Sequence, residues 1–195
     1  MPDNGDKPLD GCEVLLALTG GIACYKAADL ASRLVQAGCG TTVAMTDAAG
    51  RFIRPLTFQA LTRRRVYTGL WTPDEDVQTG HIALSERADV MVIAPATANI
   101  LAKIACGIAD DLVSTLALAS CGACQLLVAP AMNTRMWNAP PTQVNLATLR
   151  ERGVHVVGPA EGNLACGTVG PGRMSEPADI VQTITDLLKR NPSSA

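Results

Sequence analysis

The 195-residue sequence predicts an α/β fold: a doubly wound (Rossmann-like, flavodoxin-like) parallel sheet with helices on both faces, in a single domain. Short apolar runs rich in Val, Leu, Ile and Ala alternate with helical patterns, which is the order typical of right-handed βαβ units. Aromatic residues make up only 3% of the chain, so aliphatic side chains must fill the core. The expected strands are apolar almost throughout, as are strands that are covered on both faces.

The first half of the chain follows a strand, turn, helix order. An apolar run at residues 14–18 ends at Gly20 and Gly21, and the helical pattern that follows closes at Gly38, a residue suited to the C′ position. Pro95 stops the third apolar run. The sequence therefore predicts strands at 14–18, 41–45 and 89–94, a helix at 22–38, helical pieces at 47–61 that are broken by Pro55, and a loop at 63–80.

The second half repeats this order. Gly107 interrupts an Ala-rich helical segment, and Pro130 follows a fourth apolar run just as Pro95 follows the third. A Gly-rich stretch near the end has no periodic pattern and is expected to be a long loop. The predicted elements are helices at 98–119, 143–152 and 178–189, strands at 125–129 and 154–157, and a loop at 158–174.

Composition excludes several classes of partner. The 16 Lys and Arg residues are balanced by 18 Asp and Glu residues, so the chain has no basic excess to neutralise a nucleic-acid backbone. No apolar run approaches the roughly 18 residues of a membrane-spanning helix. Seven cysteines without the spacing of a disulfide framework favour a reducing, cytoplasmic compartment. We expect disordered tails at residues 1–11 and 191–195 around one domain at 12–190.

The turn at Gly20 and Gly21 is a candidate anion site. Ligands of doubly wound sheets bind at the carboxyl ends of the strands, and a glycine turn before a helix exposes backbone N–H groups to a phosphate. A plain tight turn explains the same dipeptide equally well. Because neither G-x-G-x-x-G nor a P-loop pattern is present, the turn favours a mononucleotide-type cofactor with one phosphate.

Two residues are candidates for proton transfer. His81 precedes the third apolar run and titrates near neutral pH, which makes it a candidate general base, although a structural role fits its position as well. Cys166 lies in the Gly-rich stretch, where a thiol on a closing loop can donate a proton. Cys121 and Cys124 form a lone C-x-x-C without two further ligands, so no metal site is expected.

Six short segments occur in order between residues 14 and 188: TGGIACYK (19–26), HI (81–82), APATAN (94–99), ADDL (109–112), PAMNTRMW (130–137) and LACG (164–167). Together they resemble the flavin-dependent cysteine decarboxylases. The P-x-M-N-x-x-M-W pattern is highly specific, and the A-C-G sequence is most similar to the branch that acts on phosphopantothenoylcysteine. Ile100 and Thr168 depart from the commoner family pattern.

The resemblance implies a set of site residues at the carboxyl edge of the sheet. It implies that FMN is bound by Gly20, Gly21, Ile22, Thr46, Ala48, Thr97, Ala98, Asn99 and Ala131. It implies that the catalytic residues are His81 as base, Asn133 as the residue that orients the substrate carboxylate, and Cys166 as proton donor. The implied substrate-binding residues are Met132, Asn133, Ala165 and Cys166. A homo-oligomer, either a trimer or a dodecamer of trimers, is implied as well.

The implied reaction is FMN-dependent decarboxylation of 4′-phosphopantothenoylcysteine to 4′-phosphopantetheine in coenzyme A biosynthesis. Oxidation of the substrate CH2–SH to a thioaldehyde creates an electron sink β to the carboxylate. Loss of CO2 then leaves an enethiolate, which Cys166 protonates. The synthetase that joins cysteine to phosphopantothenate is expected on a separate protein.

Three alternatives remain open from the sequence. A peptidyl-cysteine decarboxylase would stop at the enethiol, and it generally lacks the A-C-G sequence. A flavin prenyltransferase of related fold is not expected to carry the P-x-M-N-x-x-M-W pattern. A non-catalytic FMN-binding regulatory subunit would bind the cofactor without releasing CO2.

Overall fold

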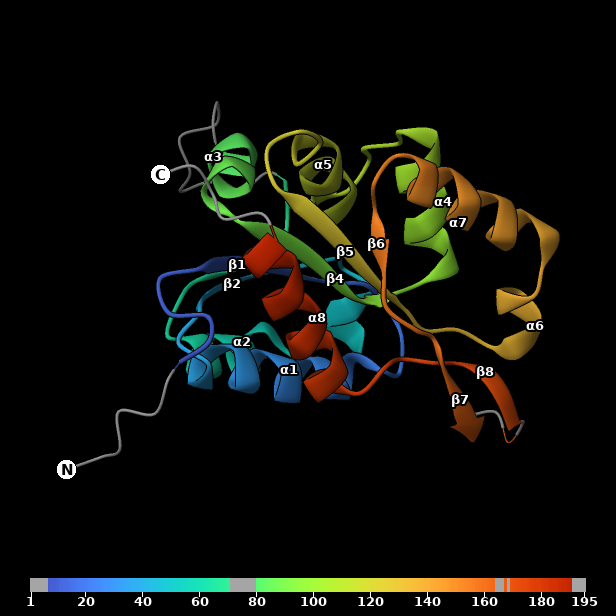
Figure 1. Ribbon diagram of the computed structural model, residues 1–195, viewed down its shortest axis with the longest axis horizontal. Helices are drawn as coiled ribbons and strands as arrows, with labels where there is room; N and C mark the ends of the chain where they lie inside the picture. The colour runs from blue at the N-terminus through green and yellow to red at the C-terminus, as the bar shows by residue number, and fades with distance from the viewer. Residues whose placement is uncertain (1–6, 71–79, 164–166, 168, 191–195) are drawn as a thin grey trace.

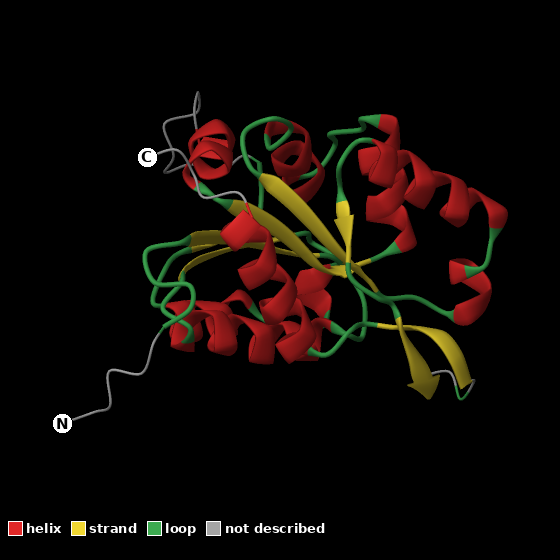
Figure 2. Cartoon of the chain, viewed as in Figure 1, coloured by secondary structure: helices red, strands yellow, loops and turns green. Residues whose placement is uncertain are grey.

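A six-stranded parallel sheet forms the centre of the computed structural model, which describes residues 7–70, 80–163, 167 and 169–190 (Figures 1 and 2). Its strands are β1 (Glu13–Leu18), β2 (Gly40–Met45), β3 (Val66–Tyr67), β4 (Val90–Ala96), β5 (Gln125–Pro130) and β6 (His155–Val156). Their order in the sheet is β3-β2-β1-β4-β5-β6. This is the Rossmann order, so the predicted doubly wound fold is confirmed.

Strand β1 lies at the middle of the sheet. Leu16 is paired with Val43 of β2 on one side and with Val92 of β4 on the other, and its side chain is fully buried. The chain builds outward from β1 to β3 and then returns to the opposite side of β1 with β4. The strand order therefore reverses between β1 and β4, which is the place where such sheets open a crevice for a ligand.

Helices cover both faces of the sheet (Figure 1). One face carries α1 (Cys24–Gln36), α2 (Pro55–Thr62) and α8 (Pro177–Arg190), and the other carries α3 (Gly80–Arg87), α4 (Ala98–Cys106), α5 (Leu112–Ala119) and α7 (Pro140–Glu151). Side chains of β1 alternate between the two apolar cores: Leu16 and Leu18 face the first, and Leu15 and Ala17 face the second. Two short helices, η1 (Ala49–Arg51) and α6 (Thr134–Trp137), lie in turns. None of the helices in the described ranges combines the length and apolar content needed to cross a bilayer.

The segment 158–174, predicted as a loop, contains an antiparallel hairpin instead. Its strands are β7 (Ala160–Asn163) and β8 (Val169–Arg173). The hairpin depends on backbone pairing between glycine-rich strands, and Gly162 lies opposite Gly170. Such strands lack the alternating apolar pattern from which a strand is predicted.

Other boundaries also differ from prediction. Strand β3 lies within the loop predicted at 63–80, where two residues pair with β2. Helix α7 begins three residues early, at Pro140, because proline is suited to the first turn of a helix. Leu9, placed in the predicted tail, is 1% exposed, and its N–H donates to the Ala37 carbonyl at 3.0 Å. The predicted tail segments 1–6 and 191–195 lie outside the described residues.

Candidate active site

Two adjoining cavities open at the carboxyl ends of β1 and β4. The first has a volume of about 730 Å³ and extends toward the end of β2, and the second has a volume of about 560 Å³ and extends toward the end of β5. Four of the described residues line both cavities: Gly20, Thr97, Ala98 and Met136. The cavities therefore meet where the strand order reverses, and their volumes are in the range of small-molecule sites.

A hydroxyl network joins the turn after β1 to the turn after β4. Thr19 is 3% exposed, its Oγ1 donates to the Pro95 carbonyl at 2.6 Å, and the same oxygen accepts the Thr97 N–H at 3.1 Å. Thr97 is the N-cap of α4, because its own Oγ1 accepts the Ile100 N–H at 3.3 Å. The two turns that border both cavities are thus held at a fixed separation.

Gly20 brings the turn after β1 against the turn after β2. A Cβ atom at Gly20 would lie 2.5 Å from the Cβ of Ala48, so only glycine fits this approach. In the turn after β2, Thr46 Oγ1 accepts the Ala49 N–H at 3.2 Å and supports the start of η1. Backbone therefore forms much of this wall, which suits a ligand recognised by N–H groups.

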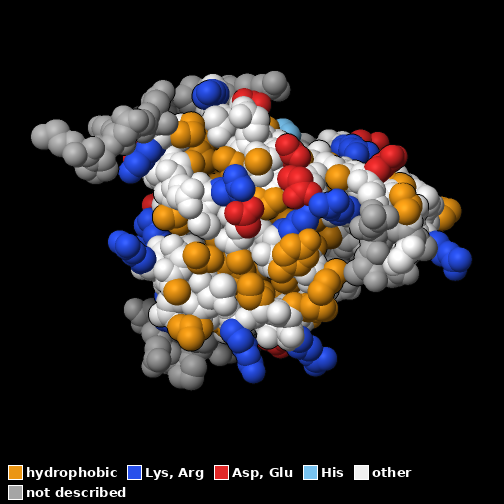
Figure 3. Space-filling view, turned by 90° about the horizontal axis from the view of Figure 1, so that it is seen from below, with side chains coloured by type: hydrophobic (Ala, Val, Ile, Leu, Met, Phe, Trp, Pro, Cys, Tyr) orange, Lys and Arg blue, Asp and Glu red, His pale blue; other side chains and the backbone are white. Residues whose placement is uncertain are grey.

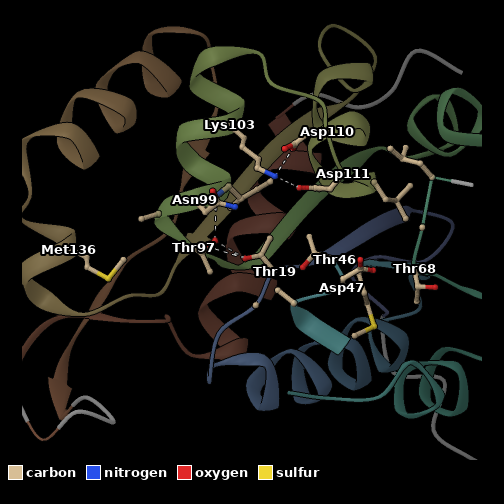
Figure 4. A pocket seen from close by; sticks show the side chains of 18 residues that line it. Thr19, Thr46, Asp47, Thr68, Thr97, Asn99, Lys103, Asp110, Asp111 and Met136 are labelled. Carbon is tan, nitrogen blue, oxygen red and sulfur yellow. Dashed lines mark hydrogen bonds and ion pairs between the residues drawn. The ribbon is translucent and has the colours of Figure 1, made fainter. Parts of the chain in front are cut away.

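A lysine and two aspartates form an ion-pair cluster at the far wall of the first cavity. Lys103 Nζ lies 2.6 Å from Asp110 Oδ1 and 2.6 Å from Asp111 Oδ2, and Figure 4 shows the three side chains converging above Thr97 and Asn99. The hydrogen bonds to Asp110 and Asp111 raise the pKa of Lys103, and the bond from Lys103 lowers the pKa of Asp110. Lys103 therefore stays charged and paired.

The second cavity has Asn133 at its edge and the base of the hairpin beside it. Asn133 is the N-cap of α6, and its Oδ1 accepts the Arg135 N–H at 2.8 Å. The Met132 N–H donates to the Gly172 carbonyl at 2.9 Å. A Cβ atom at Gly172 would lie 2.2 Å from the Met132 oxygen, so glycine is required for β8 to contact this turn.

Lys26 of α1 binds two residues that follow the end of β8. Its Nζ, in a side chain only 7% exposed, donates to the Met174 carbonyl at 3.0 Å and to Glu176 Oε1 at 2.9 Å. Arg173 Nη2 donates to the same carboxylate oxygen at 2.7 Å. Hydrogen bonding from Lys26 lowers the pKa of Glu176, so the carboxylate remains ionised at neutral pH.

The structure brings most of the predicted site residues together. All nine residues predicted to bind the cofactor line one or both cavities: Gly20, Gly21, Ile22, Thr46, Ala48, Thr97, Ala98, Asn99 and Ala131. Met132 and Asn133 line the second cavity. Their roles toward a ligand stay predictions. Ile100, which departs from the commoner family pattern, is 1% exposed.

Other predicted residues are not placed at the site. His81 lies in α3, which packs beside α5, and its side chain is outside the described residues. The described side chains of α3, at residues 82–87, line neither cavity. Ala165, Cys166 and Thr168 are also outside the described residues.

Four charged residues at the site were not predicted from the sequence. Lys26 follows the apolar stripe of α1, four positions before the buried Leu30, and this helical spacing was the signal that it is buried. Arg173 ends β8 of the hairpin and Glu176 follows it, and no apolar pattern predicted an element there. Lys103 had no signal beyond its position near two aspartates.

Known proteins resemble this chain in sequence and in structure. The model of the Flavoprotein family matches residues 4–189. The coenzyme A biosynthesis bifunctional protein CoaBC of Vibrio vulnificus (strain YJ016) is 45% identical over 184 residues, which cover 94% of this chain and 45% of that protein. CoaBC of Bacillus subtilis (strain 168) is 46% identical over 174 residues, covering 89% and 42%. The chain thus spans less than half the length of these curated relatives.

Several solved structures superpose on almost the whole of this chain. A PPC decarboxylase mutant complexed with pantothenoylaminoethenethiol superposes with a TM-score of 0.81 at 34% identity, covering 91% of this chain and 98% of that one. The FMN binding protein AtHal3 gives 0.77 at 34% identity, covering 92% and 97%. The FMN-dependent cysteine decarboxylase SpaF gives 0.79 at 31% identity, covering 92% and 98%. With a family match that extends over nearly all of its residues, the chain belongs to the Flavoprotein family.

Proposed function

We propose that the chain binds FMN and decarboxylates 4′-phosphopantothenoylcysteine to 4′-phosphopantetheine, a step of coenzyme A biosynthesis carried out in the cytoplasm. One observation carries the proposal: nine predicted cofactor residues from four separate strand ends line two adjoining cavities, the second of which is also lined by Asn133. The likeness to CoaBC proteins and to a PPC decarboxylase structure supports it.

The chemistry of the cavity walls suits FMN. Backbone at Gly20 and Gly21 and the hydroxyls of Thr46 and Thr97 offer hydrogen bonds without adding a basic cluster. Bound FMN supplies a reversible hydride acceptor for the substrate carbon that carries sulfur, so that CO2 loss has an electron sink. The interlocked turns at Thr19 and Thr97 keep this wall rigid before the ligand arrives.

The substrate carboxylate is assigned to Asn133. Because the Asn133 Oδ1 is engaged with the Arg135 N–H, the side chain is fixed at the mouth of the second cavity. Cys166 is assigned the proton that saturates the product, and it belongs to the segment that connects β7 to β8. The bond between Met132 and Gly172 ties this hairpin to the Asn133 turn.

Assembly of several copies is part of the proposal. Four large apolar side chains are exposed in or just before α1 and α2. Tyr25 lies in α1 and Leu56 in α2, whereas Ile22 precedes α1 and Phe52 precedes α2. Figure 3 views the side on which α1 and α2 lie and shows hydrophobic side chains gathered over this face. Ile22 and Tyr25 also line the second cavity, so a second copy on this face would cover the site. Because the described side chains of α3 line neither cavity, we assign the His81 of the site to a neighbouring copy. Sedimentation that finds an active monomer would overturn this part.

The purified protein offers a direct test. We expect a yellow protein with an FMN spectrum that releases CO2 from 4′-phosphopantothenoylcysteine and yields the saturated thiol by mass spectrometry. Cys166→Ser should accumulate the enethiol, whereas Cys106→Ser, a change at an exposed cysteine away from both cavities, should not. An enethiol from the unaltered protein acting on a peptide with a C-terminal cysteine would favour the peptidyl-cysteine alternative. Bound FMN without CO2 release from either substrate would favour the regulatory subunit.

A further inference from the structure

The two cavities differ in charge. Among the described residues, three aspartates and one lysine line the first: Asp47, Asp110, Asp111 and Lys103. The second is lined by Lys26 and Arg173, and no carboxylate occurs among the described residues that line it. An anionic group is therefore attracted to the second cavity and repelled from most of the first.

Glu176 is shared by both cations of the second cavity. Lys26 and Arg173 donate to the same Oε1, so two positive charges meet one negative charge and the cluster keeps a net charge of +1. Lys26 is 7% exposed and also bonds the Met174 carbonyl, which leaves it committed to the protein. Arg173 is 43% exposed and can present its remaining N–H groups to the cavity.

The hairpin positions the Arg173 side chain, which lines the second cavity. Arg173 is paired with Ala160 in the register, and a Cβ atom at Gly162 would lie 3.4 Å from Arg173 Nη1, so the side chain lies along β7. The preceding residue, Gly172, accepts the Met132 N–H. Arg173 and Asn133 both line the second cavity, so a ligand that fills this cavity can contact both residues.

We propose that Arg173 is a specificity-determining residue that binds a phosphate monoester at the end of the substrate opposite the carboxylate held by Asn133. This inference rests on the proposed function and deepens it. A guanidinium binds phosphate through two parallel hydrogen bonds, which a lysine at the same place cannot reproduce. Lys26 is a positioning residue: it holds Glu176, and through Glu176 it sets where Arg173 lies.

Matched arginine variants test the proposal in the FMN-loaded protein. Arg173→Gln should lower kcat/KM for the phosphorylated substrate about tenfold or more, mainly through KM, and leave kcat/KM for the dephosphorylated substrate unchanged. Arg173→Lys should recover part of the preference. Arg33→Gln removes an exposed arginine of α1 that pairs with Asp29, and it should change neither value. An equal loss for both substrates would overturn the proposal, because it would reveal a structural role in the hairpin.

A binding measurement separates this inference from the reaction itself. Calorimetry with 4′-phosphopantothenate and pantothenate should show a preference for the phosphorylated compound that Arg173→Gln abolishes, even if the protein releases no CO2. Equal affinity of the unaltered protein for the two compounds would overturn the inference and leave the decarboxylase proposal untouched. FMN and riboflavin titrations of the apoprotein distinguish the other source of phosphate. If Arg173→Gln weakened only FMN binding, the residue would serve the cofactor and the proposal would be wrong.

Discussion

The Thr19 hydroxyl accepts the backbone N–H of Thr97 at 3.1 Å, across 78 residues of sequence. The same hydroxyl donates to the Pro95 carbonyl at 2.6 Å. One buried side chain therefore fixes the end of β1 against the turn between β4 and α4, the two segments that border both cavities. In a doubly wound sheet these are the segments on either side of the reversal in strand order, so their separation sets the width of the ligand site.

Replacing Thr19 with valine should loosen this junction. Thr19→Val keeps the shape of the side chain but leaves the Pro95 carbonyl and the Thr97 N–H without their partner, and the free energy of unfolding should fall by about 1–3 kcal/mol. FMN should also bind more weakly. Urea denaturation and flavin fluorescence titration measure the two effects. Thr19→Ser keeps the hydroxyl and serves as control; equal behaviour of the two variants would show that the hydrogen bonds contribute nothing.

Gly20 should be intolerant of a side chain. Gly20→Ala places a Cβ atom 2.5 Å from the Ala48 Cβ and must move the turn after β1 away from the turn after β2. We expect at least a tenfold loss of FMN affinity, together with a loss of stability typical of overpacking, about 1–3 kcal/mol. Gly50→Ala is a matched control in η1, because no atom lies within 4 Å of the position of its Cβ. Normal flavin binding by Gly20→Ala would contradict the close approach.

Gly172 should matter for turnover more than for cofactor binding. Gly172→Ala puts a Cβ atom 2.2 Å from the Met132 oxygen, at a residue whose φ of 141° also favours glycine. The hairpin must then separate from the Asn133 turn, so kcat should fall at least tenfold while FMN stays bound. Steady-state assays give kcat, and a flavin absorption spectrum recorded in parallel gives the amount of bound FMN. A variant that lost FMN and activity together would instead point to general misfolding.

The reactivity of the cysteines should follow their burial. Burial raises the pKa of the Cys39 thiol to about 12, so at pH 8 its thiolate fraction is roughly three orders of magnitude below that of an ordinary thiol. Cys106 and Cys121 are exposed. Brief alkylation of the native protein, read by peptide mass spectrometry, should label Cys106 and Cys121 well before Cys39. Early labelling of Cys39 would show that the edge of the sheet around it opens readily.

How far the sequence predicted the site depends on the range of the interactions. The strand-end turns at Gly20 and Thr97 could be predicted, because apolar runs followed by glycine or proline mark the ends of buried strands. The hydrogen bond from Lys26 to Glu176 could not be predicted, because its partners are 150 residues apart and neither belongs to a local pattern that predicts the other. The hairpin was missed for a related reason, since its strands carry no alternation of apolar and polar side chains.

Stability in acid should depend on Glu13, at the opposite edge of the sheet. Arg64 binds the Glu13 carboxylate through both of its terminal nitrogens, and Arg87 adds a third contact at 3.2 Å. The hydrogen bonds from Arg64 are the main cause that lowers the pKa of Glu13 from its ordinary value near 4.5. The folded protein therefore holds fewer protons than the unfolded chain in this range, and the stabilisation is complete above about pH 5 and is lost as the pH falls through the lowered pKa.

Glu13→Gln should make the free energy of unfolding depend less steeply on pH in acid, a dependence called the acid limb below. We expect the free energy of unfolding to fall by about 1–3 kcal/mol at pH 7, because Arg64 loses its charged partner, and to depend less on pH below pH 5. Glu151→Gln, at an exposed carboxylate that ends α7, is the control and should leave the acid limb as steep as in the unaltered protein. Urea titrations at half-unit steps from pH 3 to pH 7 give the slopes. If the slope for Glu13→Gln matched that of the control, the ion pair would have no part in the stability of the amino edge, and other carboxylates would have to account for unfolding in acid.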